Sequence, residues 1–241
     1  MKHIKVFETT SALNTWKAAH SGVNPYAYFC IETGITYYQP FINANGHAYV
    51  DLGLPSGTLW ATMNLGAQSI SDPGSYFAWG ETSTKSNYSW ETYDFGTENN
   101  LTKYNTSDGK TKLDLEDDAA HVIWGGDWHI PTKAQWDELL FYINTWDYGD
   151  TIVMYFDNDN SLTFVTTGYY SGSSLSPSYG KEYQTANIAE NNNNYQYGDF
   201  CAWDDYGEGW TYPSWCDRCC GTVIRPVIGT LDVFNHPEAI F

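Results

Sequence analysis

Basic residues are scarce in this chain. Lysine and arginine together number 11 among 241 residues, against 29 aspartate and glutamate, so the formal net charge is −18. A surface with this charge repels phosphate groups, which argues against nucleic acid as a partner. Acidity of this kind also keeps a protein soluble, and that general role accounts for most of it.

Long apolar runs are missing as well. No window approaches the roughly 18 consecutive apolar residues of a membrane-spanning helix, so we expect no membrane partner. The N-terminal residues MKHIKVFETTSALNTWKAAH hold no apolar run of signal-peptide length with a small-residue cleavage site after it. We expect either that the chain is not secreted by the usual route or that its leader is not part of this sequence.

Cysteine is sparse and unevenly placed. The chain has five cysteines, an odd number, and Cys201, Cys216, Cys219 and Cys220 crowd one segment. A disulfide framework usually spreads its cysteines along the chain. Four thiolates suit tetrahedral zinc, but a zinc ribbon needs two separated Cys-x-x-Cys pairs and this segment has one. Zinc, a disulfide and cysteines with no shared role stay open, and the last interpretation is favoured.

Aliphatic residues are absent from one long stretch. Between Ala189 and Thr222 there is no Leu, Ile, Val or Met, although Asn191 to Cys220 holds eight aromatic residues. A core strand normally contains aliphatic and β-branched residues, and a disordered linker normally lacks Trp and Tyr. The mixture of Tyr, Trp, Ser, Gly and Asn is instead typical of a binding surface.

Aromatic residues make up 17% of the whole chain, which favours a packed fold. Residues 1–45 are expected to form a small N-terminal appendage: a strand in MKHIKVF, a helix from Thr10 to His20, and two strands around Thr33-Gly34. At this length the segment is short for a core of its own. It would serve attachment or oligomerisation.

The pattern changes from His47 onward. Two strands flank the turn at residues 55–57, an aromatic strand runs from Tyr76 to Trp79, and residues 81–112 are expected to form a long ordered loop. Two apolar runs around residues 157–160 predict a hairpin, and TVIRPVIG predicts a closing strand. Short strands, two helices and long aromatic loops indicate an α+β domain.

Two helices are predicted from their capping residues. Asp114 suits an N-cap with Asp117 at the third position of a helix through LEDDAAHVIW. Thr132 and Gln135 form a capping box for a second helix, which is expected to bury Trp136, Leu139 and Leu140 on one face.

Several phrases stand in a recognisable order: YVDLGLPSGTLWATMNLGA, GSYFAWGET, LDLEDDAAHVIWGGDWHIPTKAQWDELL, TTGYYSGSSL and GTVIRPV. Together they resemble the major-paralogue domain of gut Bacteroidales and their phages, over roughly residues 47–228. That resemblance implies a C-type-lectin-like fold of the branch shared with formylglycine-generating enzymes. It places the domain at residues 46–228 and leaves 229–241 as a C-terminal tail.

A subset of the proteins that this chain resembles are variable proteins of diversity-generating retroelements, whose genes are rewritten mostly at Asn codons. The segment at about 183–220 is rich in Asn, Tyr, Asp, Ser and Cys, and an ordinary GTVIRPV follows it. The resemblance thus implies a hypervariable surface on a fixed scaffold. Trp203, Trp210 and Trp215 are not reachable from such codons.

The resemblance implies ligand binding and no catalysis, cofactor or metal. The expected ligand-binding residues are Tyr183, Thr185, Asn187, Asn194, Tyr195, Tyr197, Asp205, Tyr206, Trp210, Tyr212, Ser214, Trp215, Asp217, Arg218 and Cys219. The expected scaffold residues are Trp60, Trp79, Trp124, Trp128, Trp136, Arg225 and Pro226, with a carboxylate partner for a buried Arg225.

The resemblance further implies a phage tail or receptor-binding component, possible trimers, and an unidentified host-surface or environmental ligand, either protein or glycan. A bacterial surface-displayed binding protein is the alternative. A third reading is a formylglycine-generating-type oxidase. In those enzymes four residues separate the two cysteines, whereas two residues separate Cys216 and Cys219.

Other candidate sites have simpler interpretations. The acidic run Asp114, Glu116, Asp117 and Asp118 lacks the spacing of a calcium-binding loop and is favoured as a helix N-terminus. His121 and His129 have no ligand spacing and are expected to be packing or surface residues.

Overall fold

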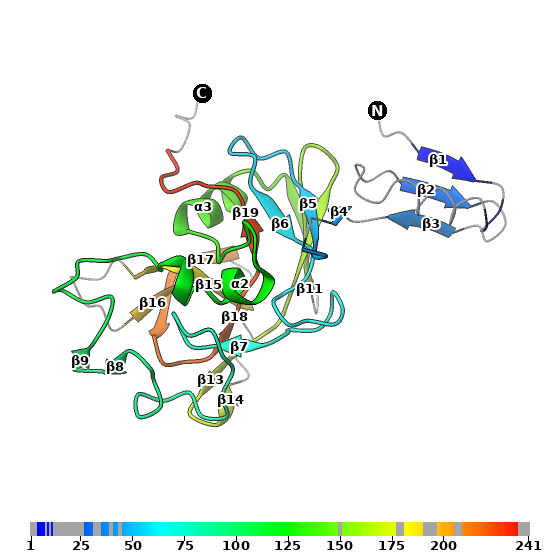
Figure 1. Cartoon of the computed structure of the whole chain (residues 1–241). Coiled ribbons are helices and arrows are strands. Elements are labelled where there is room, and N and C mark those ends of the chain that lie inside the picture. Colours follow the sequence, from blue (N-terminus) through cyan, green and yellow to red (C-terminus); the bar gives the residue numbers. More distant parts are fainter. Residues whose placement is uncertain are drawn as a thin grey trace.

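The computed structural model describes residues 4–7, 9, 11, 27–30, 35–38, 41–42, 45–148, 151–176, 181–189, 197–204 and 209–235. The predicted helix from Thr10 to His20 lies almost wholly outside these residues. In the described part the chain mixes short helices with many strands (Figure 1).

The elements follow one another in this order: β1 Ile4–Phe7, β2 Ala27–Cys30, β3 Ile35–Tyr38, β4 Phe41–Ile42, β5 Ala48–Asp51, β6 Leu59–Ala61, β7 Tyr76–Phe77, β8 Gly96–Thr97, β9 Asn100–Leu101, the 3-10 helix η1 Leu115–Asp117, α2 Ala119–Trp124, α3 Lys133–Phe141, β10 Thr145–Tyr148, β11 Thr151–Tyr155, β12 Ser161–Val165, β13 Tyr169–Ser171, β14 Ser174–Ser176, β15 Lys181–Ile188, β16 Tyr197–Asp204, β17 Gly209–Asp217, β18 Thr222–Val223 and β19 Val227–Ile228. Among the described residues, no helix has the length and apolar character needed to cross a membrane.

The N-terminal strands form a sheet of their own, in the order β1-β2-β3, to one side of the other elements in Figure 1. Strands β2 and β3 are antiparallel, as predicted for the two runs around Thr33-Gly34. Strand β4 pairs instead with β5, so Phe41–Ile42 supplies an edge strand to a sheet of the 46–228 region.

Two larger sheets organise the rest of the chain. One has the order β19-β6-β5-β4, and the turn between β5 and β6 is closed by Gly57 N donating to Leu54 O at 2.9 Å. The other has the order β17-β16-β15-β18-β7. The predicted closing strand TVIRPVIG is wrong as one element, because β18 joins the second sheet and β19 joins the first. Pro226, which has no backbone N–H, lies just before β19.

The two helices begin at different kinds of cap. Helix α3 has the predicted capping box, in which the Thr132 side chain accepts from Gln135 N and the Gln135 side chain accepts from Thr132 N. The prediction for the first helix is wrong by one turn. Asp114 makes no side-chain cap and precedes η1, whereas Asp118 accepts from His121 N at 3.0 Å and caps α2.

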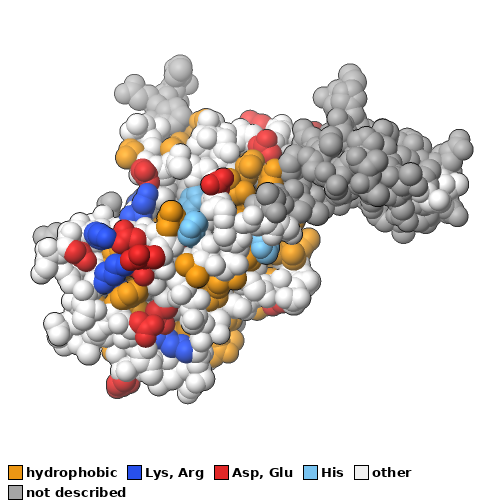
Figure 2. Space-filling model, viewed as in Figure 1, with side chains coloured by type: hydrophobic (Ala, Val, Ile, Leu, Met, Phe, Trp, Pro, Cys, Tyr) orange, Lys and Arg blue, Asp and Glu red, His pale blue; other side chains and the backbone are white. Residues whose placement is uncertain are grey.

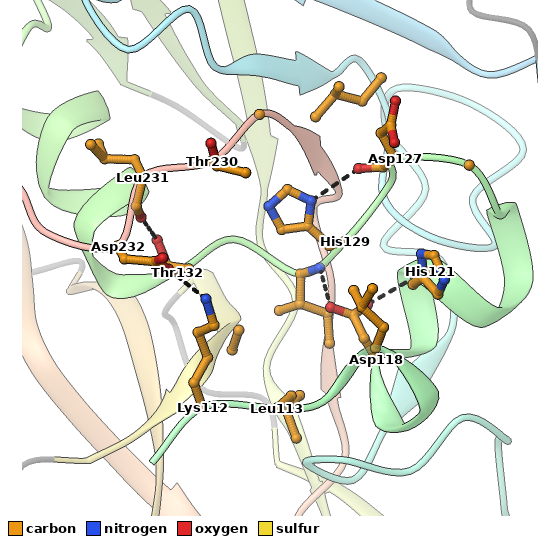
Figure 3. A pocket seen from close by; sticks show the side chains of 16 residues that line it. Lys112, Leu113, Asp118, His121, Asp127, His129, Thr132, Thr230, Leu231 and Asp232 are labelled. Carbon is orange, nitrogen blue, oxygen red and sulfur yellow. Dashed lines mark hydrogen bonds and ion pairs between the residues drawn. The ribbon is translucent and has the colours of Figure 1, made fainter. Parts of the chain in front are cut away.

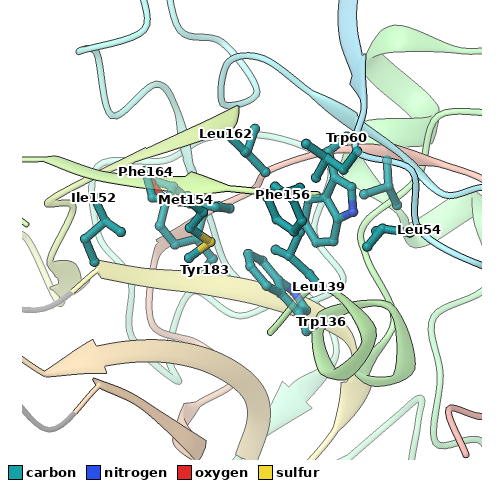
Figure 4. Close-up of a cluster of buried hydrophobic side chains, with 13 residues drawn as sticks. Leu54, Trp60, Trp136, Leu139, Ile152, Met154, Phe156, Leu162, Phe164 and Tyr183 are labelled. Atoms are coloured by element: carbon teal, nitrogen blue, oxygen red, sulfur yellow. The ribbon is translucent and has the colours of Figure 1, made fainter. Parts of the chain in front are cut away.

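A buried aromatic cluster joins α3, the β11–β12 hairpin and β15 (Figure 4). Trp136 packs edge-on against Trp60 at a centroid distance of 4.8 Å, and Phe164 and Tyr183 surround it further. Trp136 and Leu139 are fully buried, and Leu140 packs partly buried against the cluster. The predicted buried face of α3 and the predicted hairpin at 151–165 are therefore confirmed.

The expected scaffold tryptophans are mostly core residues. Trp60, Trp79, Trp128 and Trp136 are fully buried. Trp124 is partly exposed, and its ring stacks on His47 with the centroids 3.9 Å apart and the planes 8° from parallel.

Among the described residues Arg225 has no carboxylate partner, contrary to the expectation. Its guanidinium is fully buried and donates to Asn64 Oδ1 at 2.7 Å, Ala61 O at 3.2 Å and Thr163 O at 2.9 Å. Its charge also lies over the Phe164 ring, 4.7 Å from the centroid. Neutral oxygens and an aromatic face thus replace an ion pair.

Candidate functional site

The segment expected to bind ligand folds as strands β15, β16 and β17 at one end of the five-stranded sheet (Figure 1). Strand β16 pairs antiparallel with both neighbours, and β17 is the edge strand. Most described residues of the stretch without aliphatic side chains therefore belong to an antiparallel strand pair at the edge of this sheet.

A β-bulge interrupts this hairpin. Phe200 pairs with Ser214 and Ala202 with Thr211, so one residue of β16 lies opposite Tyr212 and Pro213 of β17. Proline cannot donate to a strand ladder and is confined to edges and bulges, and Pro213 satisfies both conditions. The bulge bends and twists the edge strand, which is a known protection against pairing with other chains.

The register places a distinctive set of residues on one face of the β16–β17 hairpin. Cross-strand partners share a face, and so do alternate residues of one strand. The pairs Tyr197 with Asp217, Asp199 with Trp215 and Trp203 with Trp210 therefore fall on the same face. We call these six positions the aromatic–acidic face. Ser214 falls on the opposite face, with Phe200 as its partner.

Sequence reasoning found four members of this face, Tyr197, Trp210, Trp215 and Asp217. It missed Asp199 and set Trp203 aside. The signal was present in the sequence, because residues 197, 199 and 203 are separated by even numbers, as positions on one face of a strand must be.

The predicted ligand contacts at the start of the segment lie in the interior of the structure. Tyr183 and Thr185 are fully buried. The Tyr183 hydroxyl lies 3.1 Å from both the N and the O of Val165, donating to the carbonyl and accepting from the amide. Thr185 Oγ1 hydrogen-bonds within β15 to Asn187 N and O. Both residues lie in the scaffold because β15 is the inner strand of the sheet.

The predicted contacts Arg218 and Cys219, which follow β17, are also buried. Arg218 is fully buried and Cys219 is 4% exposed. The Arg218 guanidinium donates to the Tyr93 hydroxyl at 3.0 Å and to Tyr104 O at 3.0 Å. It lies 4.6 Å from the ring centroid of Trp79. The C-terminal end of the segment is thus held by an aromatic box, the rings of Trp79, Tyr93 and Tyr104 around Arg218.

Asp217 lies at the boundary between the buried end and the aromatic–acidic face. Its carboxylate is partly buried and accepts a hydrogen bond from the Trp90 indole. Burial, and then the nearby charge of Glu98, raise the pKa of this carboxyl above its ordinary value. Neither Trp90 nor Glu98 was predicted, because both come from the distant 81–112 loop.

The remaining predicted residues are less fully placed. Asn187 is partly buried, and its side chain accepts from Lys133 N at 2.8 Å, which ties it to the start of α3. Tyr212 lies in the bulge. Asn194, Tyr195, Asp205 and Tyr206 lie outside the described residues.

Three cysteines meet where β17 ends. Cys216 is partly exposed, whereas Cys219 and Cys220 are buried, and all three are free thiols. Hydrogen bonds to a neighbouring thiol, together with burial, raise the pKa of Cys219 and Cys220. A reactive cysteine nucleophile needs the opposite shift, toward thiolate. Cys201 pairs with Tyr183 on the neighbouring strand and is not adjacent to this turn in register.

A cavity of about 400 Å³ lies between α2 and the segment after β19 (Figure 3). Figure 3 shows His129 at its centre, between Thr230 and the pair Asp127 and His121. His129 Nδ1 lies 3.1 Å from Asp127 O, which can only accept, so Nδ1 carries the proton. The carboxylate of Asp118 at its base accepts from His121 N and Ile130 N. The polar groups of Asp118 and His129 in the cavity lining are therefore used within the fold. Asp118 caps α2 and binds the loop after it, and His129 bonds to the same loop.

Carboxylates of the acidic run at 114–118 form ion pairs with a lysine side chain. Carboxylate oxygens of Asp114, Glu116 and Asp117 lie within 4.8 Å of one another, but the ammonium of Lys103 pairs with all three. Figure 2 shows basic and acidic side chains interleaved in one area of the visible face. The cluster is therefore explained by ion pairing rather than by calcium.

The segment after β19 packs against the domain rather than projecting from it. Thr132 Oγ1 donates to Leu231 O at 2.5 Å, Lys112 pairs with Asp232 at 2.5 Å, and the Phe234 ring lies 5.6 Å from that of Phe141. The first residues of the expected 229–241 tail thus cover the start and one side of α3. Residues 236–241 lie outside the described part.

Comparison with protein-family models, with curated proteins and with solved structures gives no match to this chain.

Proposed function

We propose that this protein is a ligand-binding module whose binding surface is the aromatic–acidic face of the β16–β17 hairpin. The observation that carries the proposal is the register, which brings Tyr197, Trp210, Trp215 and Asp217 onto one face of an edge hairpin. Tyr and Trp provide large, rigid contact areas at low entropic cost, which is why they dominate binding hot spots.

The way in which the hairpin is held supports this proposal. Buried groups fix both ends, with Tyr183 in β15 before it and Arg218 directly after it. A rigid frame with a polar and aromatic segment between its fixed ends is the arrangement that tolerates changes in sequence. We therefore propose a C-type-lectin-like scaffold that displays a diversified segment. Because the residues at both ends of the expected 183–220 segment are buried, we propose residues 187–217 as its bounds.

The resemblance to the major-paralogue domain supports display on a phage virion, with a bacterial surface protein as the alternative. A repeated display would multiply a weak single-site affinity through multivalency. Catalysis gains no comparable support, because the pKa values of Cys219 and Cys220 are raised and both thiols are buried.

The test is a comparison of the wild-type chain with Trp210→Ala on glycan and peptide arrays. Loss of a central aromatic contact typically weakens binding by about 30-fold or more. The expected result is one or more ligands that bind the wild type and are lost by Trp210→Ala at unchanged thermal stability. Ligands that bind both proteins equally would contradict this site.

A further inference from the structure

The turn between β4 and β5 contains the dipeptide Asn45-Gly46, and Ile42 pairs with Ala48 across its ends. Gly46 has a φ of 82°, which glycine adopts without steric cost because it has no Cβ. Asparagine and glycine are the usual residues of such hairpin turns. The turn therefore explains the sequence, but the same dipeptide also has a chemical reactivity of its own.

Asparagine is a thermolabile residue, and it reacts most readily when glycine follows it. The backbone N of Gly46 attacks Cγ of Asn45, a new N–Cγ bond forms, and the side-chain nitrogen leaves as ammonia. Water then opens the resulting cyclic imide at either carbonyl, which leaves aspartate or isoaspartate in place of Asn45. The net change is the uptake of water and the loss of ammonia, and no oxidant, reductant or cofactor takes part.

The structure leaves room for this reaction. Asn45 and Gly46 are both exposed, so water reaches the side-chain amide. A Cβ placed on Gly46 would meet nothing within 4 Å, so the space around the attacking nitrogen is open. No backbone oxygen of a described residue accepts a hydrogen bond from Gly46 N.

The Asn45 side chain joins this turn to the end of α2. Its Nδ2 donates to Trp124 O at 2.7 Å, and a Cβ placed on Gly126 would lie 2.8 Å from the same nitrogen. The amide therefore fits closely against the glycines that follow the helix. A carboxylate in its place has no proton to donate, and the Trp124 carbonyl can only accept. The C-terminal end of a helix also repels negative charge.

We propose that Asn45 is a site of spontaneous deamidation, and that this modification releases the β4–β5 turn from the end of α2. The inference is independent of the proposed binding function. Asn45 lies where the N-terminal strands continue into the 46–228 region, so the reaction alters the junction between these two parts of the chain.

The chain contains its own matched control. Asn158 is exposed, and its Nδ2 also donates to a backbone carbonyl, Asp51 O at 3.0 Å, but Asp159 follows it instead of glycine. The native full chain is incubated in heavy-oxygen water at mildly alkaline pH, digested and examined by mass spectrometry. The expected products are aspartate and isoaspartate at Asn45, each containing heavy oxygen, while Asn158 stays intact. Conversion of both residues at equal rates would overturn the proposal.

A parallel incubation in concentrated urea separates the effect of the sequence from that of the fold. The unfolded chain should also convert Asn45, and Gly46→Ala should lose most of the product in both conditions. Conversion in urea with an intact Asn45 in the native chain would contradict the proposal, because the hydrogen bond to Trp124 O would then protect the amide.

Hydrogen exchange tests the release of the turn. In Asn45→Asp, exchange should become faster at Gly125 N, which donates to His121 O at 2.8 Å at the end of α2. Asn158→Asp adds the same charge at the other turn and should leave this amide unchanged. Equal exchange at Gly125 N in the wild type and in Asn45→Asp would show that deamidation does not release the turn.

Discussion

The guanidinium of Arg218 lies 4.6 Å from the ring centroid of Trp79, and Trp79 N donates to Arg218 O at 2.9 Å. Side chain and backbone thus join the same two residues. The Trp79 indole donates in turn to Thr185 O at 3.0 Å, in the strand that begins the segment. One tryptophan therefore connects both ends of the hairpin region to the scaffold.

Replacing Arg218 should damage stability far more than a surface charge does. In Arg218→Met, the Tyr93 hydroxyl and the Tyr104 carbonyl lose a buried donor, which costs about 3 kcal/mol of unfolding free energy. Urea denaturation measures the change. Lys110→Met is the control, because its ammonium is exposed and its loss should cost less than about 0.5 kcal/mol. Equal effects of the two variants would show that the aromatic box is not an anchor.

Tyr183 and Trp210 should behave in opposite ways. Tyr183→Phe removes the hydroxyl that bridges Val165 N and O, so it should reduce stability by about 1–2 kcal/mol and leave ligand affinity unchanged. Trp210→Ala should reduce affinity and leave stability almost unchanged. Denaturation and array binding of both variants measure this. A loss of affinity in Tyr183→Phe with unchanged stability would return Tyr183 to the binding site.

The sequence predicted elements whose signals are local. The capping box at Thr132, the turn at 55–57 and the hairpin at 151–165 each depend on a few adjacent residues, and all three are present. The start of α2 was misplaced because several neighbouring acids can cap a helix equally well. Only the contact of Asp118 with Ile130 N, from the chain beyond the helix, decides among them.

The candidate site was predictable in outline but not in its limits. Composition marked the segment, yet composition cannot tell an anchor from a contact. Tyr183 is buried because β15 lies in the middle of the sheet, and nothing in the residue type itself indicates this. The partners of Arg218 and Arg225 were likewise unpredictable, because neutral carbonyls and rings from distant segments leave no charge pattern in the sequence.

The capping box can be tested in the same way. Thr132→Ala removes the cap of α3 and the hydrogen bond to Leu231 O, so it should cost about 1–2 kcal/mol of unfolding free energy. Thr230→Ala, at an exposed position two residues after β19, is the control and should change little. Hydrogen exchange near Leu231 should also rise in Thr132→Ala. Unchanged exchange there would mean that the Thr132 contact does not hold this segment.

Buried tyrosines should make the fold sensitive to alkali. Burial, with smaller contributions from nearby tyrosines, raises the pKa of Tyr76 to about 12. The unfolded chain loses that proton near pH 10, so it binds fewer protons than the folded chain between about pH 10 and 12. Stability should therefore fall as the pH rises through this window.

Tyr76→Phe should show a shallower fall in stability over the same pH range, measured by urea denaturation at several pH values. Its hydroxyl donates to Thr167 O at 2.6 Å, so the variant should also be less stable at neutral pH. Parallel stability curves for the two proteins above pH 10 would contradict a raised pKa at Tyr76.

The central claim is that a fixed scaffold carries a diversified binding hairpin, and deep sequencing of this gene from one natural population tests it most directly. The account predicts that substitutions concentrate at Asn-type codons between about residues 187 and 217. Tyr183, Thr185, Arg218 and Cys219 should stay fixed with the GTVIRPV that follows, because all four side chains are buried. Variation spread evenly along the chain, or reaching these four positions as often as the hairpin, would contradict it.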